Sequence, residues 1–97
     1  MVSELPIKSQ QQIKMPQNVN TNPDEIKELQ GYLRRISYTD TRVPRVAIDG
    51  IYGDLTKQAV EEIQRINAFP ITGVVDEATW NALVGEYMYV TQQNSLP

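Results

Sequence analysis

The stretch that decides the fold is residues 49–83, which read DGIYGDLTKQAVEEIQRINAFPITGVVDEATWNAL. It contains one pattern twice, without a gap, at a constant offset of 23 positions. The aligned pairs are Gly50 with Gly73, Ile51 with Val74, Tyr52 with Val75, Thr56 with Thr79, Ala59 with Ala82 and Val60 with Leu83. Each copy is a glycine turn, two apolar residues, a short polar start and a helix. Because repetition at a fixed period indicates a repeated structural unit, we expect two successive turn-and-helix units.

Length and composition predict one small domain. The chain has 97 residues, of which 40% are hydrophobic and 22% are charged, as in ordinary globular proteins. Its net charge of −3 argues against nucleic acid or an anionic membrane as a partner, since both attract basic surfaces. The N-terminus lacks the features of a signal peptide, although a leader could precede this sequence in a longer protein. We expect a monomer.

The chain lacks two of the side chains that enzymes use most often, and its acidic side chains have the sequence context of structural or solvent-exposed residues. The chain has no cysteine and no histidine, which excludes thiolate metal sites and nucleophiles activated by histidine. The adjacent Glu61 and Glu62 point about 100° apart on a helix and do not form a glycosidase pair. Asp49 and Asp76 have the sequence context of turn and cap residues. The sequence therefore predicts a protein that is not an enzyme and that carries no cofactor and no metal.

Capping residues and apolar spacing predict three helices. The first should span about residues 23–37, because Asn22 is a favourable N-cap and proline follows it. The second should span about 54–67, and the third should follow its cap Asp76 and end near residue 87. The apolar positions expected to face inward are Ile26, Leu29, Leu33 and Ile36 in the first, Ala59, Val60 and Ile63 in the second, and Leu83 in the third. The predicted fold class is all-α, a compact three-helix bundle with an internal duplicated loop–helix repeat.

The two ends of the chain are expected to lie outside this domain. Residues 1–22 are polar, interrupted by proline and without helical or strand periodicity, which predicts a flexible N-terminal tail. An alternative is an extended arm that docks on a partner. Residues 23–89 would form the domain, and residues 90–97 would form a C-terminal tail.

The connection at residues 38–48 holds the basic residues that cluster in the sequence. Four arginines lie in or just before it, namely Arg34, Arg35, Arg42 and Arg45, with Asp40 as the only acid among them. One interpretation is a solvated loop, and the other is a contact surface for carboxylates or phosphates, which arginine binds with two parallel hydrogen bonds. Two aromatic residues have equally open roles: Trp80 and Tyr52 could each pack inside the domain or contact a ligand.

Taken together, these motifs resemble the peptidoglycan-binding domain of type 1 over about residues 25–89. The matching positions are Leu29, Gln30, Asp49, Gly50, Tyr52, Gly53, Thr56, Ala59, Val60, Ile63, Gln64, Thr72, Gly73, Val74, Val75, Asp76, Thr79, Trp80 and Leu83. The chain departs from the family at Ile63, where phenylalanine is common, and at residues 68–69, where Gly-Leu is common. The long connection resembles versions from spore-forming Gram-positive bacteria.

The resemblance implies a three-helix domain that binds cell-wall peptidoglycan without cleaving it. Its partners would be the glycan strand or the stem peptide, with a cell-wall hydrolase as an accompanying protein. It also implies that Gln30 and Gln64 tie down the two loops through their amides. The compartment stays unknown, being the cell wall or the spore if the family function holds. Alternatives are an intracellular protein-interaction module in spore or phage assembly, or the targeting fragment of a larger hydrolase.

The expected ligand site is a shallow groove along residues 38–52. We expect Tyr52 to stack on a sugar ring. Arg42 and Arg45 would pair with muramyl or peptide carboxylates, Tyr38 would line the groove, and Asp49 would mainly hold the turn.

Overall fold

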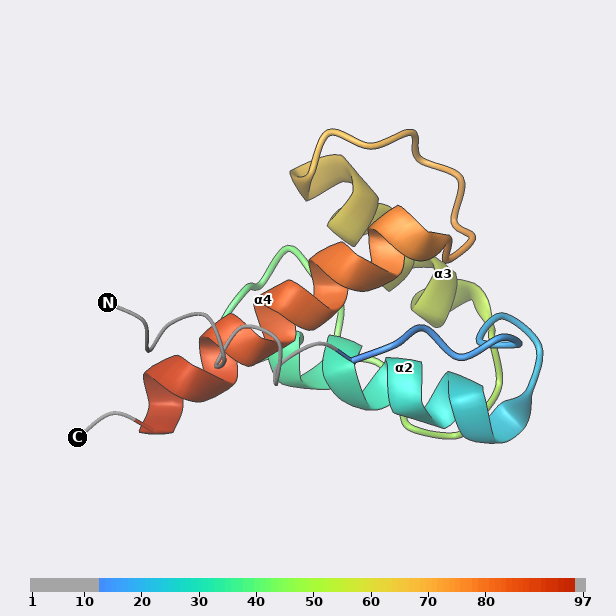
Figure 1. The fold of residues 1–97 in the computed structure, drawn as a ribbon, viewed down its shortest axis with the longest axis horizontal. Helices are drawn as coiled ribbons and strands as arrows, with labels where there is room; N and C mark the ends of the chain where they lie inside the picture. Colours follow the sequence, from blue (N-terminus) through green and yellow to red (C-terminus); the bar gives the residue numbers. More distant parts are fainter. Residues whose placement is uncertain (1–12, 96–97) are drawn as a thin grey trace.

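The computed structural model describes the backbone of residues 13–95 and the side chains of residues 13–92. The described residues form three helices and no strand, namely α2 (Pro23–Ser37), α3 (Asp54–Ile66) and α4 (Glu77–Ser95). In Figure 1, α4 crosses the molecule between the other two helices, and it packs against both. The predicted all-α, three-helix architecture is confirmed.

Helix α2 begins where local signals place it. The side-chain oxygen of Asn22 accepts hydrogen bonds from the backbone amides of Asp24, at 3.0 Å, and Glu25, at 3.1 Å. These bonds satisfy two of the free amides at a helix start, and Pro23 occupies the first turn, where no amide is needed. The predicted apolar stripe is buried along its whole length.

Helix α3 ends in a reversal that uses a left-handed residue. Ala68 has a φ of 59°, and its amide donates to the carbonyl of Arg65 at 3.1 Å. The amide of Phe69 donates to the carbonyl of Gln64 at 2.8 Å. This pair of bonds caps the last carbonyls of a helix, and glycine is the residue most often found at the left-handed position. Alanine therefore stands where the resemblance puts glycine, and the turn forms all the same.

Helix α4 is longer than the sequence indicates. It was expected to end near residue 87 with a tail from residue 90, but it continues to Ser95. Val90 lies inside the core with 4% of its surface exposed, so the last turns are held by packing. Gly85 suggests an ending in the sequence, but it lies within the helix in space that a side chain could fill. Residues 96–97 of the expected tail lie outside the described residues.

Residues 13–22 were also expected in a tail, and here the structure differs. Val19 is buried, and the side chain of Asn20 exchanges two hydrogen bonds with the backbone of Val75, at 2.9 and 3.0 Å. The indole of Trp80 donates to the carbonyl of Ile13 at 2.9 Å. Figure 1 shows this segment (blue) running beside α2. Residues 1–12, the rest of that expected tail, lie outside the described part of the chain.

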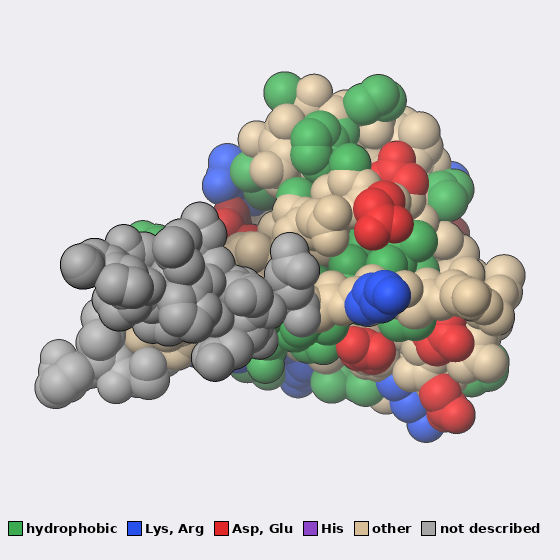
Figure 2. All heavy atoms as spheres, in the orientation of Figure 1, with side chains coloured by type: hydrophobic (Ala, Val, Ile, Leu, Met, Phe, Trp, Pro, Cys, Tyr) green, Lys and Arg blue, Asp and Glu red, His purple; other side chains and the backbone are tan. Residues whose placement is uncertain are grey.

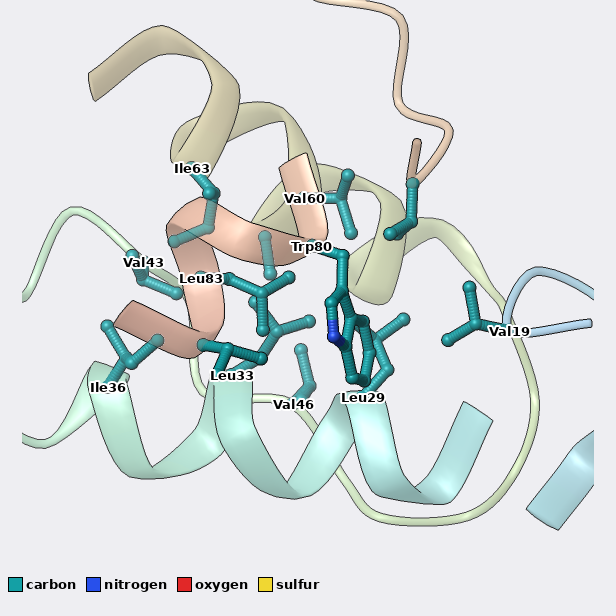
Figure 3. Packing of buried hydrophobic residues seen from close by; sticks show 13 residues of the cluster. Val19, Leu29, Leu33, Ile36, Val43, Val46, Val60, Ile63, Trp80 and Leu83 are labelled. Carbon is teal, nitrogen blue, oxygen red and sulfur yellow. The ribbon is translucent and has the colours of Figure 1, made fainter. Parts of the chain in front are cut away.

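Trp80 lies at the centre of the core. Its surface is fully buried, and Figure 3 shows its ring among aliphatic side chains from all three helices and from the preceding segment. The neighbours labelled there include Leu29, Leu33, Val60, Leu83 and Val19. Its ring also meets that of Tyr32 edge to face, with centroids 5.7 Å apart. Of its two possible roles, Trp80 has the packing role.

Candidate functional site

A buried glutamine holds the first turn, residues 49–53. The side-chain oxygen of Gln30 accepts the amides of Asp49, at 3.0 Å, and Gly50, at 2.9 Å. Its nitrogen donates to Asp49 Oδ1, the carbonyl of Ile51 and Thr56 Oγ1, at 2.9 to 3.0 Å. Gly50 has a φ of 77°, and an added Cβ would lie 3.1 Å from the carbonyl oxygen of Pro23, so glycine is required there.

Gln64 holds the second turn, residues 72–76, in the same way. Its oxygen accepts the amides of Thr72, at 2.9 Å, and Gly73, at 3.0 Å. Its nitrogen donates to Thr72 Oγ1, the carbonyl of Val74 and Thr79 Oγ1, at 3.0 to 3.2 Å. Each partner lies 23 positions after its counterpart in the first turn. The amide role that the resemblance implies for both glutamines is thus present in the structure.

The two units differ in how the chain reaches the turn. Gln30 and Gly50 are 20 positions apart, whereas Gln64 and Gly73 are 9 apart, so the first connection holds 11 more residues. Those extra residues include most of the expected ligand site. The two units therefore hold their turns with the same hydrogen bonds. They differ in the 11 extra residues of the first unit, which carry most of the candidate site.

Asp49 and Tyr52 are occupied by contacts within the protein. Hydrogen bonds from the amide of Ile51 and from Gln30 lower the pKa of the Asp49 carboxyl below its usual value. The hydroxyl of Tyr52 donates to the carbonyl of Gly73 at 2.6 Å and so joins the first turn to the second. Burial, with a smaller effect of Glu61, raises the pKa of Tyr52 to about 12.

Tyr38 and two arginines form a compact cluster at the end of α2. The guanidinium of Arg45 lies over the ring of Tyr38, with its carbon 4.7 Å from the centroid. Arg34 donates from Nε to the Tyr38 hydroxyl at 2.8 Å and from a terminal nitrogen to the carbonyl of Val46 at 3.0 Å. Tyr38 is 49% exposed, so the stacked pair faces solvent.

On the face shown in Figure 2, charged side chains lie scattered among uncharged ones.

Arg42, in the same connection, has a different set of contacts. Its Nε and one terminal nitrogen bind both oxygens of Asp40, at 2.9 and 2.7 Å, which lowers the pKa of that carboxyl. The pair lines a surface hollow of about 550 Å³, whose opposite side is formed by Glu86 and Tyr89 of α4. Sequence reasoning missed both residues. Glu86 lies within the predicted helix, but only the packing of α4 shows that it borders the connection, and Tyr89 lies beyond the predicted end of the helix.

The five expected site residues thus occupy three places. Tyr38 and Arg45 are together, Arg42 lines the hollow, and Asp49 and Tyr52 hold the turn. Tyr38, the C-cap residue of α2, follows Gln30, the partner of Asp49, by eight positions, or about 12 Å along the helix axis. Within residues 13–95, no cluster of acidic side chains is suited to a metal ion, and no helix is long and apolar enough to cross a membrane.

Comparison with known families identifies the domain. The family model described as "Putative peptidoglycan binding domain" matches residues 22–83, which is more than half of the chain. Neither the curated proteins nor the solved structures give a significant match. The matched residues contain both glutamine-held turns and the long connection between α2 and α3. This chain therefore belongs to the family of peptidoglycan-binding domains.

Proposed function

We propose that this chain binds cell-wall peptidoglycan without cleaving it, through the connection at residues 38–48 and the adjacent end of α4. The observation that carries the proposal is the Arg45–Tyr38 stack, a guanidinium fixed on an exposed ring. No acceptor for Arg45 is found among the described residues. A positioned guanidinium of this kind suits a carboxylate, which it binds with two hydrogen bonds. The stem peptide supplies carboxylates, and muramic acid supplies one wherever no peptide is attached to it.

Of the other expected site residues, Arg42 and Tyr52 would contact the ligand directly and Asp49 would act indirectly. Arg42 keeps its bond to Asp40 and offers its remaining N–H groups to ligand oxygens. Tyr52 contributes the exposed part of its ring to a sugar, since its hydroxyl is already bound to Gly73. Asp49 acts through the turn that it holds. The module would work as a monomer that accompanies a cell-wall hydrolase.

Retention on purified sacculi tests the proposal. We expect the wild-type chain to be pulled down at low salt and the double variant Arg42→Ala/Arg45→Ala to be retained about a hundredfold less, because two charge-assisted contacts are lost, each worth about tenfold. The double variant Lys14→Ala/Lys27→Ala is the matched control, since it removes two exposed positive charges that lie outside the connection. Absence of wild-type retention would contradict the proposed function.

A protein-interaction module on the same scaffold is the second candidate. It is favoured by exposed aliphatic side chains beside both turns: Ile48 and Ile51 at the first, Ile71 and Val74 at the second, each 46–66% exposed. Grouped exposed apolar residues often mark protein contacts. A fluorescent fusion separates the candidates, because localisation to the cell wall supports peptidoglycan and signal inside the cell supports a protein partner.

A further inference from the structure

The hollow between the connection and α4 has the volume of a small binding site and a lining that is about half polar. At about 550 Å³ it lies within the usual range for ligand pockets, roughly 300–1,000 Å³. One side is lined by Thr39, Thr41 and Arg42. The other side presents Glu86 and the ring of Tyr89, which is 59% exposed. The hollow is therefore bordered by an aromatic ring and by charges of both signs.

The charges in this hollow are not equivalent. Asp40 is satisfied by Arg42, and it fixes the direction of the guanidinium through two bonds. Arginine has five N–H donors, so three remain for a ligand. Glu86 is half-buried, and no hydrogen bond or ion pair to it is found among the described residues. The site thus offers a held cation with free donors and, across the hollow, a carboxylate whose acceptors are free.

We propose that the hollow binds the zwitterionic end of a stem-peptide diamino acid, its carboxylate on Arg42 and its ammonium group on Glu86. This inference rests on the proposed function and narrows it from peptidoglycan as a whole to the peptide. The N-acetylated glycan carries no ammonium group, so it would leave the Glu86 carboxylate with Arg42, which lies beyond ion-pair distance, as its charged neighbour. Burying an unpaired charge is unfavourable, and this selects for the peptide.

A consequence of this chemistry is selectivity for peptides that are not cross-linked. Cross-linking converts the free amine of the diamino acid into an amide, which is neutral and bulkier. A second hollow, of about 380 Å³, shares Thr41 and Arg42 with the first and leads towards Arg65 on α3. A stem peptide can therefore extend past Arg42 on that side while its diamino acid occupies the first hollow.

The affinity of a synthetic stem tripeptide ending in diaminopimelate tests the inference, measured by titration calorimetry and by amide shifts in NMR spectra. We expect binding by the wild-type chain, with shifts at residues 39–42 and 86–90. Acetylating the free amine of the peptide should weaken binding about tenfold, as should Glu86→Gln, because each removes one charge of the pair. Glu77→Gln, an exposed acid in the first turn of α4, is the matched control and should leave the affinity unchanged.

The same proteins on sacculi distinguish this inference from the function on which it rests. If the wild-type chain is retained equally by native and amine-acetylated sacculi, the inference is wrong and peptidoglycan binding stands. If it is retained by neither, the proposed function fails. Equal affinity for the two tripeptides also overturns the inference. The acetylated peptide needs no variant, so this outcome is decisive even if Glu86→Gln fails to fold.

Discussion

Tyr52 shows how one residue serves two parts of the duplicated stretch. Its hydroxyl donates to the carbonyl of Gly73, in the other unit, at 2.6 Å. Its ring is half-buried, and the loss of solvent together with Glu61 raises its pKa from 10.0 to about 12. The neutral hydroxyl is therefore favoured in the folded protein more than in the unfolded chain. Because the pKa of Tyr52 differs between the folded and the unfolded states, the free energy of unfolding depends on pH in the alkaline range.

The free energy of unfolding should fall as the pH rises from 10 to 12. Below pH 10 the Tyr52 hydroxyl is neutral in both states, and its full contribution to stability is present. Above pH 10 the unfolded chain loses this proton first, so the contribution disappears as the pH passes the folded pKa. Urea unfolding at several pH values measures the effect.

Tyr52→Phe supplies the comparison for this titration. At pH 7 the variant should be less stable by about 1 kcal/mol, the typical net value of one hydrogen bond. Its stability should then fall less steeply than that of the wild type between pH 10 and 12. Tyr32, whose pKa is also raised by burial and by Glu28, is present in both proteins and cancels in the difference. Parallel curves would show that the Tyr52 hydroxyl has no such role.

At the scale of elements, the two glutamine-held turns allow a matched experiment. Gln30→Glu would place a carboxylate oxygen against Asp49 Oδ1 and the carbonyl of Ile51, neither of which can donate, and only the hydroxyl of Thr56 could rotate to donate to it. Gln64→Glu would face one carbonyl, that of Val74, and two hydroxyls, those of Thr72 and Thr79, which can both rotate to donate. We expect losses of about 4 kcal/mol for the first and about 2 kcal/mol for the second, since buried charges depend strongly on their partners.

Urea denaturation at pH 7, followed by the fluorescence of Trp80, measures this order. Gln58→Glu, on the exposed side of α3, is the control and should change the free energy of unfolding by no more than about 0.5 kcal/mol. A larger loss for Gln64→Glu than for Gln30→Glu would contradict the explanation, because Gln64 faces two hydroxyls that can donate, whereas Gln30 faces one hydroxyl and the carboxylate of Asp49.

Contacts between residues close in the sequence made the helices predictable. The features that the sequence did not predict depend on contacts between residues far apart in the chain. The start of α2 was predictable, because Asn22 acts on amides two and three residues away. The segment before it was not, because its partners Val75 and Trp80 lie 55 and 67 positions further along the chain. The Trp80 indole binds the backbone carbonyl of Ile13. Every residue has such a carbonyl, so no particular residue type at position 13 could indicate this contact in the sequence.

The candidate site was predicted in part for the same reason. The arginine-rich connection is a local feature of the sequence, and its length already marks it as different from the second unit. The arginines of this connection take part in two sets of contacts, the Tyr38 cluster and the hollow. Which set each arginine joins depends on the element that packs beside it. Tyr89 faces Arg42 only because α4 continues beyond the end that its sequence suggests.

At the scale of the whole molecule, residues 13–22 behave as a fourth element of the core. Val19 packs into the same cluster as Trp80, as Figure 3 shows, and Asn20 binds the backbone at the start of the second turn. The matched family region begins at residue 22, so this segment lies before it. Every buried side-chain polar atom within the described residues has a partner, and for the Trp80 indole that partner comes from this segment.

Val19→Ala should therefore lower the free energy of unfolding by roughly 2 kcal/mol, because it removes two buried methyl groups and leaves a cavity. Val74→Ala makes the same change at a side chain that is 54% exposed and should cost less than about 0.5 kcal/mol. Urea denaturation of both variants measures the difference. Equal costs would mean that the segment only lies on the surface, and the stable domain would then begin at α2. A larger cost at Val19 means that the folded unit extends beyond the family region, because an N-terminal segment completes the packing around Trp80.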